Sequence, residues 1–394
     1  MAQDKSNVKY AAGSIIQMQG EKPKDSIYIV QQGTIRTEWI LEKRIEDTGP
    51  GSMVGLISAF TELPPMETVT ALSPVQGILV KKAHFEAFFK SNPTIVKKIF
   101  QTLAQQRHNL EYTLANAILR VDTDKASPQL PTSTENLYKL GSIYEKFGNN
   151  HTAYLAYKRY LYYHPGGADA RAAEDRRDAL AINAVEQPEY GPADVYRKYP
   201  KYSVVFFEGE PGNEFYLIRS GLVRAAKIVD DKRAMIGMAR TGNIFGEAVL
   251  FADQPRNYTV IAHEDLEVLT ITEDGLMNML STTPKMISHL MYCLAGRVWY
   301  ASHRLQKLAE KEPGNRVLGF LALTLETEHL SLNFDGGHTF YFGSKELVEM
   351  AGLSDEEGKA VMDPVLASGV LVEQEDGKLF CPKVPSLSRA FVLK

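Results

Sequence analysis

At 394 residues the chain is too long for a single hydrophobic core, and its length predicts about two to four domains. The composition is that of a globular protein, with 44% apolar and 23% charged residues. A formal net charge of -4 provides no global basic excess of the kind that favours binding to nucleic acid or to an anionic membrane.

The N-terminal residues, the lack of long apolar stretches and the cysteines indicate the compartment. Met1–Tyr10 is polar and mixed in charge, which argues against a signal peptide. No stretch approaches the roughly 20 apolar residues of a membrane-spanning helix. Cys293 and Cys381 are too few and too widely spaced for a cysteine-rich metal site, and they favour a reducing compartment. We therefore expect a cytoplasmic protein.

Two parts of the chain repeat each other. The paired segments, each aligned without a gap, are Tyr28–Gly33 with Tyr216–Gly221, Val54–Leu56 with Phe245–Glu247, and Pro64–Ala71 with Pro255–Ala262. Both copies contain short alternating apolar and polar runs between glycine turns, typical of half-buried strands in a roll or barrel. A long helical stretch follows each copy. The sequence therefore predicts a duplicated β-roll with a C-terminal helix.

Between the copies lies a pattern of small, apolar and aromatic residues. Its members are Leu137, Leu140, Gly141, Tyr144, Ala153, Tyr157 and Pro165. This spacing resembles one tetratricopeptide repeat of about 34 residues, in which a glycine lets two antiparallel helices approach closely. Ala168–Asn183 supplies a further helix, and Asp122–Thr134 and Glu186–Pro200 are the expected linkers. A single repeat favours a rigid spacer over a partner-binding module.

The helix after the second copy has the pattern of a dimer seam. Its apolar residues alternate in steps of four and three, at Ile287, Met291, Leu294, Val298, Ala301, Leu305 and Leu308. This alternation is typical of a left-handed coiled coil. We favour a homodimer through Ile287–Leu308, with a helix packed on its own domain as the alternative.

The strongest functional signal is Phe245–Ala248 followed by Pro255–Thr259. It closely resembles the phosphate-binding cassette of the cyclic-nucleotide-binding domain family. A cyclic nucleotide offers one phosphate charge and one free ribose hydroxyl. Gly246 permits close backbone approach at a helix start, Glu247 can accept the 2′-hydroxyl proton, and Arg256 supplies a planar donor fork for the phosphate.

The first copy lacks both charged groups. Leu56 stands where the second copy has Glu247, and Pro65 where it has Arg256. Charge-assisted contacts of this kind contribute about 1.5–3 kcal/mol each, so losing both weakens binding by roughly two to four orders of magnitude. We expect the first roll to be a structural or dimerising copy, although a different ligand is left open.

The base is less clearly specified. In the cAMP receptor protein family a Thr-Ser pair on the long helix reaches the purine, and the matching residues here are Ala301 and Ser302. The amide of Asn257 suits phosphate or guanine equally well, so cGMP stays the alternative. We favour cAMP because most bacterial receptors of the type that the chain resembles use it. The predicted ligand-binding residues are Gly246, Glu247, Ala248, Pro255, Arg256, Asn257, Tyr258 and Ser302.

Arg316–Lys394 resembles the winged helix-turn-helix of the cAMP receptor protein/FNR-like family. Its expected elements are a helix at Asn315–Thr327, a helix and turn at Ser344–Ser354, a recognition helix at Asp355–Ser368 and a wing at Gly369–Phe380. The recognition helix, however, opens with three carboxylates, where DNA readers normally carry Arg, Gln or Asn, and Pro364 is expected to bend or break it. We favour a protein contact over DNA binding and leave the choice open.

These inferences combine into a multidomain α+β prediction. Its parts are a degenerate cyclic-nucleotide-binding β-roll of the jelly-roll type with its long helix at 1–121, a tetratricopeptide-like hairpin at 132–185, a competent β-roll with its dimerisation helix at 190–312, and a winged helix at 313–394. The scattered histidines form no H-x-H metal pair, and no nucleophile elbow or phosphate loop occurs, so we expect neither an enzyme nor a cofactor. The predicted function is a cAMP receptor that repositions its C-terminal module to control a protein partner; the alternative is a cAMP-responsive transcription factor.

Overall fold

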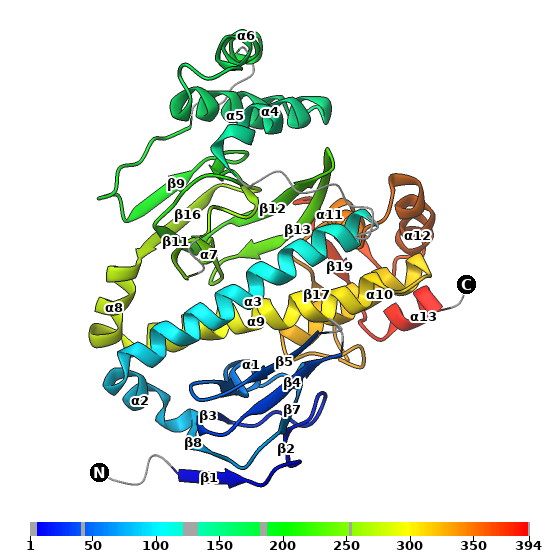
Figure 1. The fold of residues 1–394 in the computed structure, drawn as a ribbon. Coiled ribbons are helices and arrows are strands. Elements are labelled where there is room, and N and C mark those ends of the chain that lie inside the picture. The colour runs from blue at the N-terminus through cyan, green and yellow to red at the C-terminus, as the bar shows by residue number, and fades with distance from the viewer. Residues whose placement is uncertain (1–5, 41–43, 121–132, 182–186, 252–253, 393–394) are drawn as a thin grey trace. The chain divides into compact units, whose positions relative to one another are not determined.

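The computed structural model describes every residue except 1–5, 41–43, 121–132, 182–186, 252–253 and 393–394 (Figure 1). The chain divides into two compact units, and each combines separate stretches of sequence. The first unit contains Met1–Leu110, Asp274–Ala309 and Leu321–Ser331, and the second contains Glu111–Glu273, Glu310–Phe320 and Leu332–Lys394. The predicted linker Asp122–Thr134 falls almost wholly outside the described residues.

The first unit is built around a β-roll of two antiparallel sheets. Its strands are β1 (Ser6–Tyr10), β2 (Ile15–Gln17), β3 (Ser26–Gln32), β4 (Ile35–Trp39), β5 (Arg44–Thr48), β6 (Met53–Val54), β7 (Thr68–Ala71) and β8 (Val75–Lys81). They pair in the orders β1-β8-β3-β6 and β2-β7-β4-β5. Strand β4 shows the underlying alternation, because Ile35, Thr37 and Trp39 are buried while Arg36 and Glu38 are only partly covered.

The second unit contains a roll with the same topology. Its strands are β9 (Tyr196–Tyr199), β10 (Val204–Phe206), β11 (Glu214–Ser220), β12 (Leu222–Val229), β13 (Lys232–Arg240), β14 (Ile244–Phe245), β15 (Thr259–Ala262) and β16 (Leu266–Thr272). The sheet orders β14-β11-β16-β9 and β10-β15-β12-β13 reproduce those of the first roll strand for strand. The predicted duplication of a β-roll is therefore confirmed.

The helix that follows the second roll packs on the first one. Helices α1 (Leu56–Thr61), α2 (Phe85–Ser91) and α3 (Pro93–Leu119) follow the first roll's strands, and α8 (Glu273–Thr282) and α9 (Pro284–Leu308) follow those of the second. Within the first unit α9 contacts α1 and α2. Trp299 of α9 donates a hydrogen bond of 2.9 Å from Nε1 to the carbonyl oxygen of Pro64.

The predicted dimer seam is thereby buried inside the chain from Ile287 to Ala301, and its last two members, Leu305 and Leu308, are partly buried. Ile287, Met291, Leu294 and Val298 are each 0% exposed. This face of α9 lies in the same unit as the first roll. The sequence had suggested either a homodimer or packing on the helix's own domain, and neither interpretation anticipated packing on the first roll. A homodimer through Ile287–Leu308 stays a prediction, and it is not needed to cover these side chains.

The inserted helices share a core with the second roll. They are the short turn η2 (Thr134–Asn136), α4 (Leu137–Lys146), α5 (Asn150–Tyr163) and α6 (Ala170–Leu180). A Cβ on Gly141 would lie 2.6 Å from the ring of Tyr157, so α4 and α5 approach closely only with glycine there. The core that these helices form includes Val204 and Phe207 of the roll. The segment is thus part of the second unit's body, and its tetratricopeptide assignment stays a prediction.

The C-terminal segment adds helices and a small sheet. Its elements are α10 (Pro313–Thr327), β17 (His338–Thr339), α11 (Ser344–Met350), α12 (Asp355–Ala367), β18 (Val372–Glu373), β19 (Leu379–Cys381) and α13 (Ser386–Val392), with the strands ordered β17-β19-β18. Ser354 caps α12, and its hydroxyl accepts a hydrogen bond from the backbone N–H of Glu357. Helix α12 runs through Pro364 to Ala367, so the expected break does not occur there. The winged-helix assignment stays a prediction.

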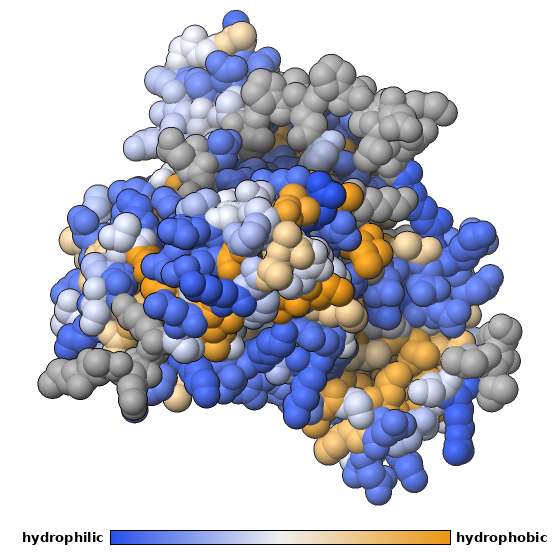
Figure 2. Space-filling view, turned by 60° about the horizontal axis from the view of Figure 1, so that its bottom comes forward, coloured by the Kyte–Doolittle hydropathy of each residue, from blue (hydrophilic) through white to orange (hydrophobic). Residues whose placement is uncertain are grey.

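The outer surface is mixed in polarity. On the face drawn in Figure 2, hydrophilic residues surround small groups of hydrophobic ones. Among the described helices none combines the length and apolar character that crossing a membrane requires.

Candidate functional site

The predicted cassette forms a glycine turn, a short helix and a buried return to the sheet. Strand β14 ends at Gly246, whose φ of +81° is favourable for glycine and strained for other residues. A Cβ at this position would lie 2.6 Å from Nη1 of Arg256. The one-turn helix α7 (Ala248–Phe251) follows. The turn therefore requires glycine both for its conformation and for the approach of the guanidinium.

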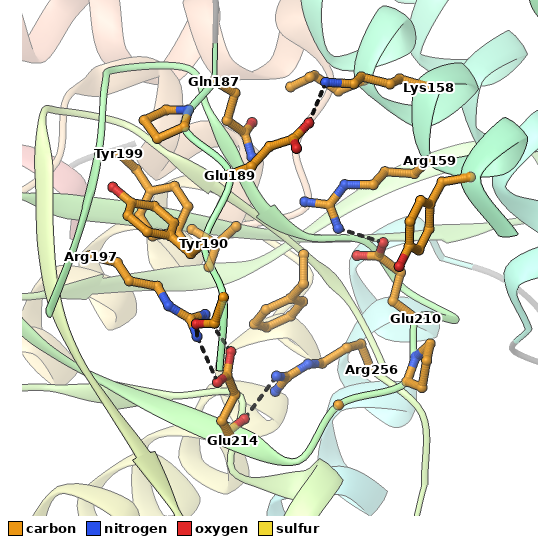
Figure 3. A pocket seen from close by; sticks show the side chains of 18 of the residues that line it. Lys158, Arg159, Gln187, Glu189, Tyr190, Arg197, Tyr199, Glu210, Glu214 and Arg256 are labelled. Atoms are coloured by element: carbon orange, nitrogen blue, oxygen red, sulfur yellow. Dashed lines mark hydrogen bonds and ion pairs between the residues drawn. The ribbon is translucent and has the colours of Figure 1, made fainter. Parts of the chain in front are cut away.

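Arg256 is buried without a carboxylate partner among the described residues. Its side chain is 4% exposed, and its guanidinium carbon lies 4.3 Å from the centre of the Phe206 ring. Nη1 donates to the carbonyl oxygen of Gly246 at 2.7 Å. Nη2 donates to the carbonyl oxygen of Glu214 at 2.8 Å (Figure 3). Nε is buried with no hydrogen-bond partner among the described residues. A buried cation held only by carbonyls and a ring face favours an incoming anion, because desolvating an unpaired charge is costly.

The other predicted residues of the loop gather at the same place. Glu247 is 1% exposed and directly follows Gly246. The backbone N–H of Gly246 donates to the hydroxyl of Tyr258 at 3.3 Å. Ala248 is also buried, and Pro255 is partly buried. The structure thus brings together a buried carboxylate, a buried guanidinium and a glycine turn within the second unit.

Asn257 belongs to a buried polar network that the sequence did not reveal. Its Nδ2 donates to Oε2 of Glu111 at 3.0 Å, and Lys227 Nζ donates to its carbonyl oxygen at 2.7 Å and to its Oδ1 at 3.1 Å. Burial raises the pKa of the nearby Glu208 carboxyl, and the charge of Lys227 opposes that rise. Asn257 is therefore oriented by one acceptor and one donor on opposite ends of its amide.

Glu111 comes from α3, the helix that follows the first roll. The end of this helix, from Glu111 onward, belongs to the second unit. Ser302, the predicted helix residue, lies on α9, which belongs to the first unit. The sequence contains a signal that could have indicated Glu111, because Glu111 follows Pro93 of α3 at the same interval as Ser302 follows Pro284 of α9. Glu111 is therefore a further candidate on the equivalent helix, and Ser302 stays a predicted ligand residue.

The first roll keeps the backbone of the cassette and lacks its charges. Gly55 has the same φ of +81° as Gly246. Leu56 is 5% exposed in the place of Glu247, and Pro65 is buried in the place of Arg256. Gln17 replaces the ring of Phe206 and donates to Glu67 at 2.8 Å. This loop therefore has the shape of an anion site without its cation.

Comparisons with known proteins agree with this duplication. The family "Cyclic nucleotide-binding domain" matches residues 7–92 and 196–283. The chain contains two cyclic nucleotide-binding domains. It is 28% identical to the cyclic AMP receptor protein of Thermus thermophilus over 176 residues, which cover 44% of this chain and 78% of that protein.

A second relative shares a shorter region. The chain is 35% identical to the cAMP-dependent protein kinase regulatory subunit of Aspergillus fumigatus over 95 residues, which cover 24% of this chain and 22% of that subunit. A solved CRP/FNR-family transcriptional regulator, also from Thermus thermophilus, aligns with 50% of this chain and 98% of its own, at 22% identity and a TM-score of 0.39. The two curated relatives are named as a receptor and a regulatory subunit, and neither name is that of a catalytic chain.

Proposed function

We propose that the protein is a regulatory receptor that binds one cyclic nucleotide, cAMP in preference to cGMP, in its second β-roll. The observation that carries this proposal is the buried Arg256 guanidinium, which lies at the glycine turn that precedes Glu247. Among the described residues it has only carbonyl oxygens as hydrogen-bond partners. The cyclic phosphate would accept the hydrogen bonds that the Arg256 guanidinium now donates to the carbonyl oxygen of Gly246, and Glu247 would accept a hydrogen bond from the ribose 2′-hydroxyl. The cAMP named in both curated relatives supports this ligand.

Strand β12 provides a route from the cassette to the C-terminal segment. At one end Lys227 holds Asn257 of the cassette. Three residues earlier, Arg224 donates to Glu349 of α11 at 2.5 Å, and Arg233 of the paired strand β13 donates to the same carboxylate at 3.2 Å. A shift of β12 on ligand binding would therefore change these ion pairs. This is the proposed means by which the ligand repositions the C-terminal segment.

A protein partner fits the exposed end of α12 better than DNA does. Asp355 and Glu356 are exposed in its first turn, and Glu357 pairs with Arg120 at 2.9 Å. Carboxylates at this end would repel phosphate, on which affinity for DNA depends. We therefore propose control of a protein partner through this segment.

The alternative is a cAMP-responsive transcription factor. One observation favours it: the curated relatives include the CRP-like cAMP-activated global transcriptional regulator of Mycobacterium tuberculosis, which is 27% identical over 120 residues, or 54% of that protein. Filter binding of random DNA duplexes to the full chain, with and without cAMP, separates the two. If the filter retains duplex only in the presence of cAMP, the transcription factor replaces the protein-partner proposal. If duplex is not retained with or without cAMP, the protein-partner proposal is supported.

Isothermal calorimetry on the full chain tests the ligand. We expect heat of binding with cAMP, a weaker response with cGMP, and loss of both in Arg256→Met. Pro65→Ala, at the equivalent position of the first roll, is the matched control and should bind as the wild type does. Absence of heat with either nucleotide, or equal binding by Arg256→Met, would overturn the proposal.

A further inference from the structure

A cavity in the second unit adjoins the cassette at Arg256. It has a volume of about 650 Å³, within the range of about 300–1,000 Å³ that is usual for ligand sites. Its walls come from α5, the segment Gln187–Pro192, the loop Glu210–Glu214 and residues of β9, β10 and β11. Of the predicted cassette residues only Arg256 lines it, and Figure 3 shows its guanidinium among the labelled side chains of this cavity.

The walls of the cavity are held in place by specific contacts. Arg159 of α5 donates from Nη1 to Oε1 of Glu210 at 2.8 Å, and Glu210 is 2% exposed. The other oxygen of Glu210 accepts from the backbone N–H of Phe207 at 2.7 Å. The amide of Gln187 both donates to and accepts from the backbone of Val204, at 2.7 and 2.9 Å. The cavity is therefore a built feature of the contact between the inserted helices and the roll.

Its charges do not balance. The charged side chains in its lining are Lys158, Arg159, Arg197, Arg256, Glu189, Glu210 and Glu214. Three of the four cations pair with the three carboxylates, as Lys158 with Glu189, Arg159 with Glu210, and Arg197 with Glu214. Arg256 contacts carbonyl oxygens, and its Nε has no partner among the described residues. The described lining thus has one uncompensated positive charge, which suits a single negative charge on a ligand.

Tyrosines supply much of the remaining wall. They are Tyr162, Tyr163, Tyr190, Tyr199 and Tyr216. The hydroxyl of Tyr216 is engaged with Glu214, whereas Tyr162 is 77% exposed. Tyr163 lies near Arg159, Glu210 and Arg256, and burial raises the pKa of its hydroxyl. Rings placed next to a cation favour a planar, aromatic ligand.

We propose that this cavity is a second ligand site, which takes a small molecule with one negative charge and a planar ring. Arg256 links it to the cassette, because the same guanidinium that lines the cavity also donates to the carbonyl oxygen of Gly246. Occupation of the cavity therefore changes the affinity of the cassette for its nucleotide, and the effect is reciprocal. The coupling rests on the proposed function, whereas the site does not.

Fluorescence titration of the full chain with 1-anilinonaphthalene-8-sulfonate tests the site. We expect saturable binding whose dissociation constant rises about tenfold in Lys158→Glu, which reverses one charge of the lining. Lys139→Glu is the matched control, because Lys139 and Lys158 are both 48% exposed and each pairs with a carboxylate at 2.8 Å, but Lys139 does not line the cavity. Equal effects of the two variants, or no saturable binding, would overturn the site.

A second pair of variants tests the aromatic wall. Tyr162→Ala should weaken binding of the same probe severalfold, while Tyr202→Ala should leave it unchanged, since Tyr202 is 55% exposed and lies outside the lining. The uncharged N-phenyl-1-naphthylamine should bind the wild type and Lys158→Glu equally. An unchanged affinity in Tyr162→Ala would contradict the proposed ring contact.

Calorimetric titration with cAMP, in the presence of a saturating concentration of the probe, separates the existence of the cavity site from its coupling to the cassette. A shift of the cAMP dissociation constant by about threefold or more, matched by the same shift for the probe at saturating cAMP, supports the coupling. No shift would refute the coupling. Complete displacement of the probe by cAMP would place it in the cassette and overturn the second site. Probe binding that depends on Lys158 in a chain that binds no cyclic nucleotide would refute the proposed function and leave the cavity site standing.

Discussion

The two rolls of this chain share a backbone and differ in a few side chains. Their sheets have the same strand order, and the glycines that open their cassette loops have the same φ of +81°. Glu247 and Arg256 of the second roll correspond to Leu56 and Pro65 of the first. The comparison teaches that the fold alone supplies the shape of the loop, whereas in the proposed function two ionisable side chains would make that shape a site for a cyclic phosphate.

The largest expected effect is at Arg256. Replacing it by Met removes the cation that faces the cyclic phosphate while keeping an unbranched apolar stem, so the cAMP dissociation constant should rise roughly a hundredfold or more. Competition with a fluorescent cAMP analogue measures this. Wild-type affinity in Arg256→Met would mean that the difference between the two loops has no functional meaning.

Glu247→Gln should have a smaller effect. The amide keeps the shape of the side chain and loses the charge that strengthens the hydrogen bond to the ribose, so affinity should fall about tenfold. Leu56→Met in the first roll conserves volume and serves as the control, with no expected change in cAMP affinity. A 2′-deoxy analogue of cAMP should bind wild type and Glu247→Gln equally; a persistent difference would contradict the ribose contact.

The two long helices sharpen the comparison further. Glu111→Ala leaves Nδ2 of Asn257 without its acceptor, and we expect cAMP affinity to fall severalfold. Ser302→Ala, at the equivalent register of α9, is the matched variant, and we expect it to have the smaller effect. A loss of affinity confined to Ser302→Ala would support the assignment made from sequence and contradict a role for Glu111.

Glu208 offers the smallest effect, on stability rather than binding. The backbone N–H of Glu208 donates a hydrogen bond to the hydroxyl of Thr259, and in the first roll the backbone N–H of Gln19 donates to that of Thr68. Gln19 is therefore the equivalent of Glu208, and its side chain is a neutral amide. Burial raises the pKa of Glu208 above its ordinary value of 4.5. The folded chain therefore holds this proton more tightly than the unfolded chain, and stability is lost as pH rises through the window that begins near 4.5.

Glu208→Gln should remove that pH-dependent loss and increase the free energy of unfolding at pH 7 by up to about 1 kcal/mol. Urea unfolding at about pH 5 and pH 7, for wild type and variant, measures the difference. Because the charge of Lys227 opposes the rise in pKa, the gain is modest. A variant that is less stable than wild type at pH 7 would show that the carboxylate is favourably paired.

The sequence predicted the features that depend on local patterns. Alternation gave the strands, and the aligned blocks around Gly55 and Gly246 identified the duplication and the charged cassette. Periodicity showed that Ile287–Val298 must be buried, but it does not specify against which partner, so the packing of α9 on the first roll was missed. Glu111 and the cavity at Arg159 were missed for the same reason, because both depend on contacts between segments far apart in the chain.

The number of cyclic nucleotides bound per chain tests the central claim most directly. Equilibrium dialysis of the full chain against labelled cAMP should saturate at one nucleotide per chain, with none bound by Arg256→Met. Saturation at two per chain would show a nucleotide site besides the cassette of the second roll, and saturation at zero would remove the second roll as a receptor; either result contradicts the account.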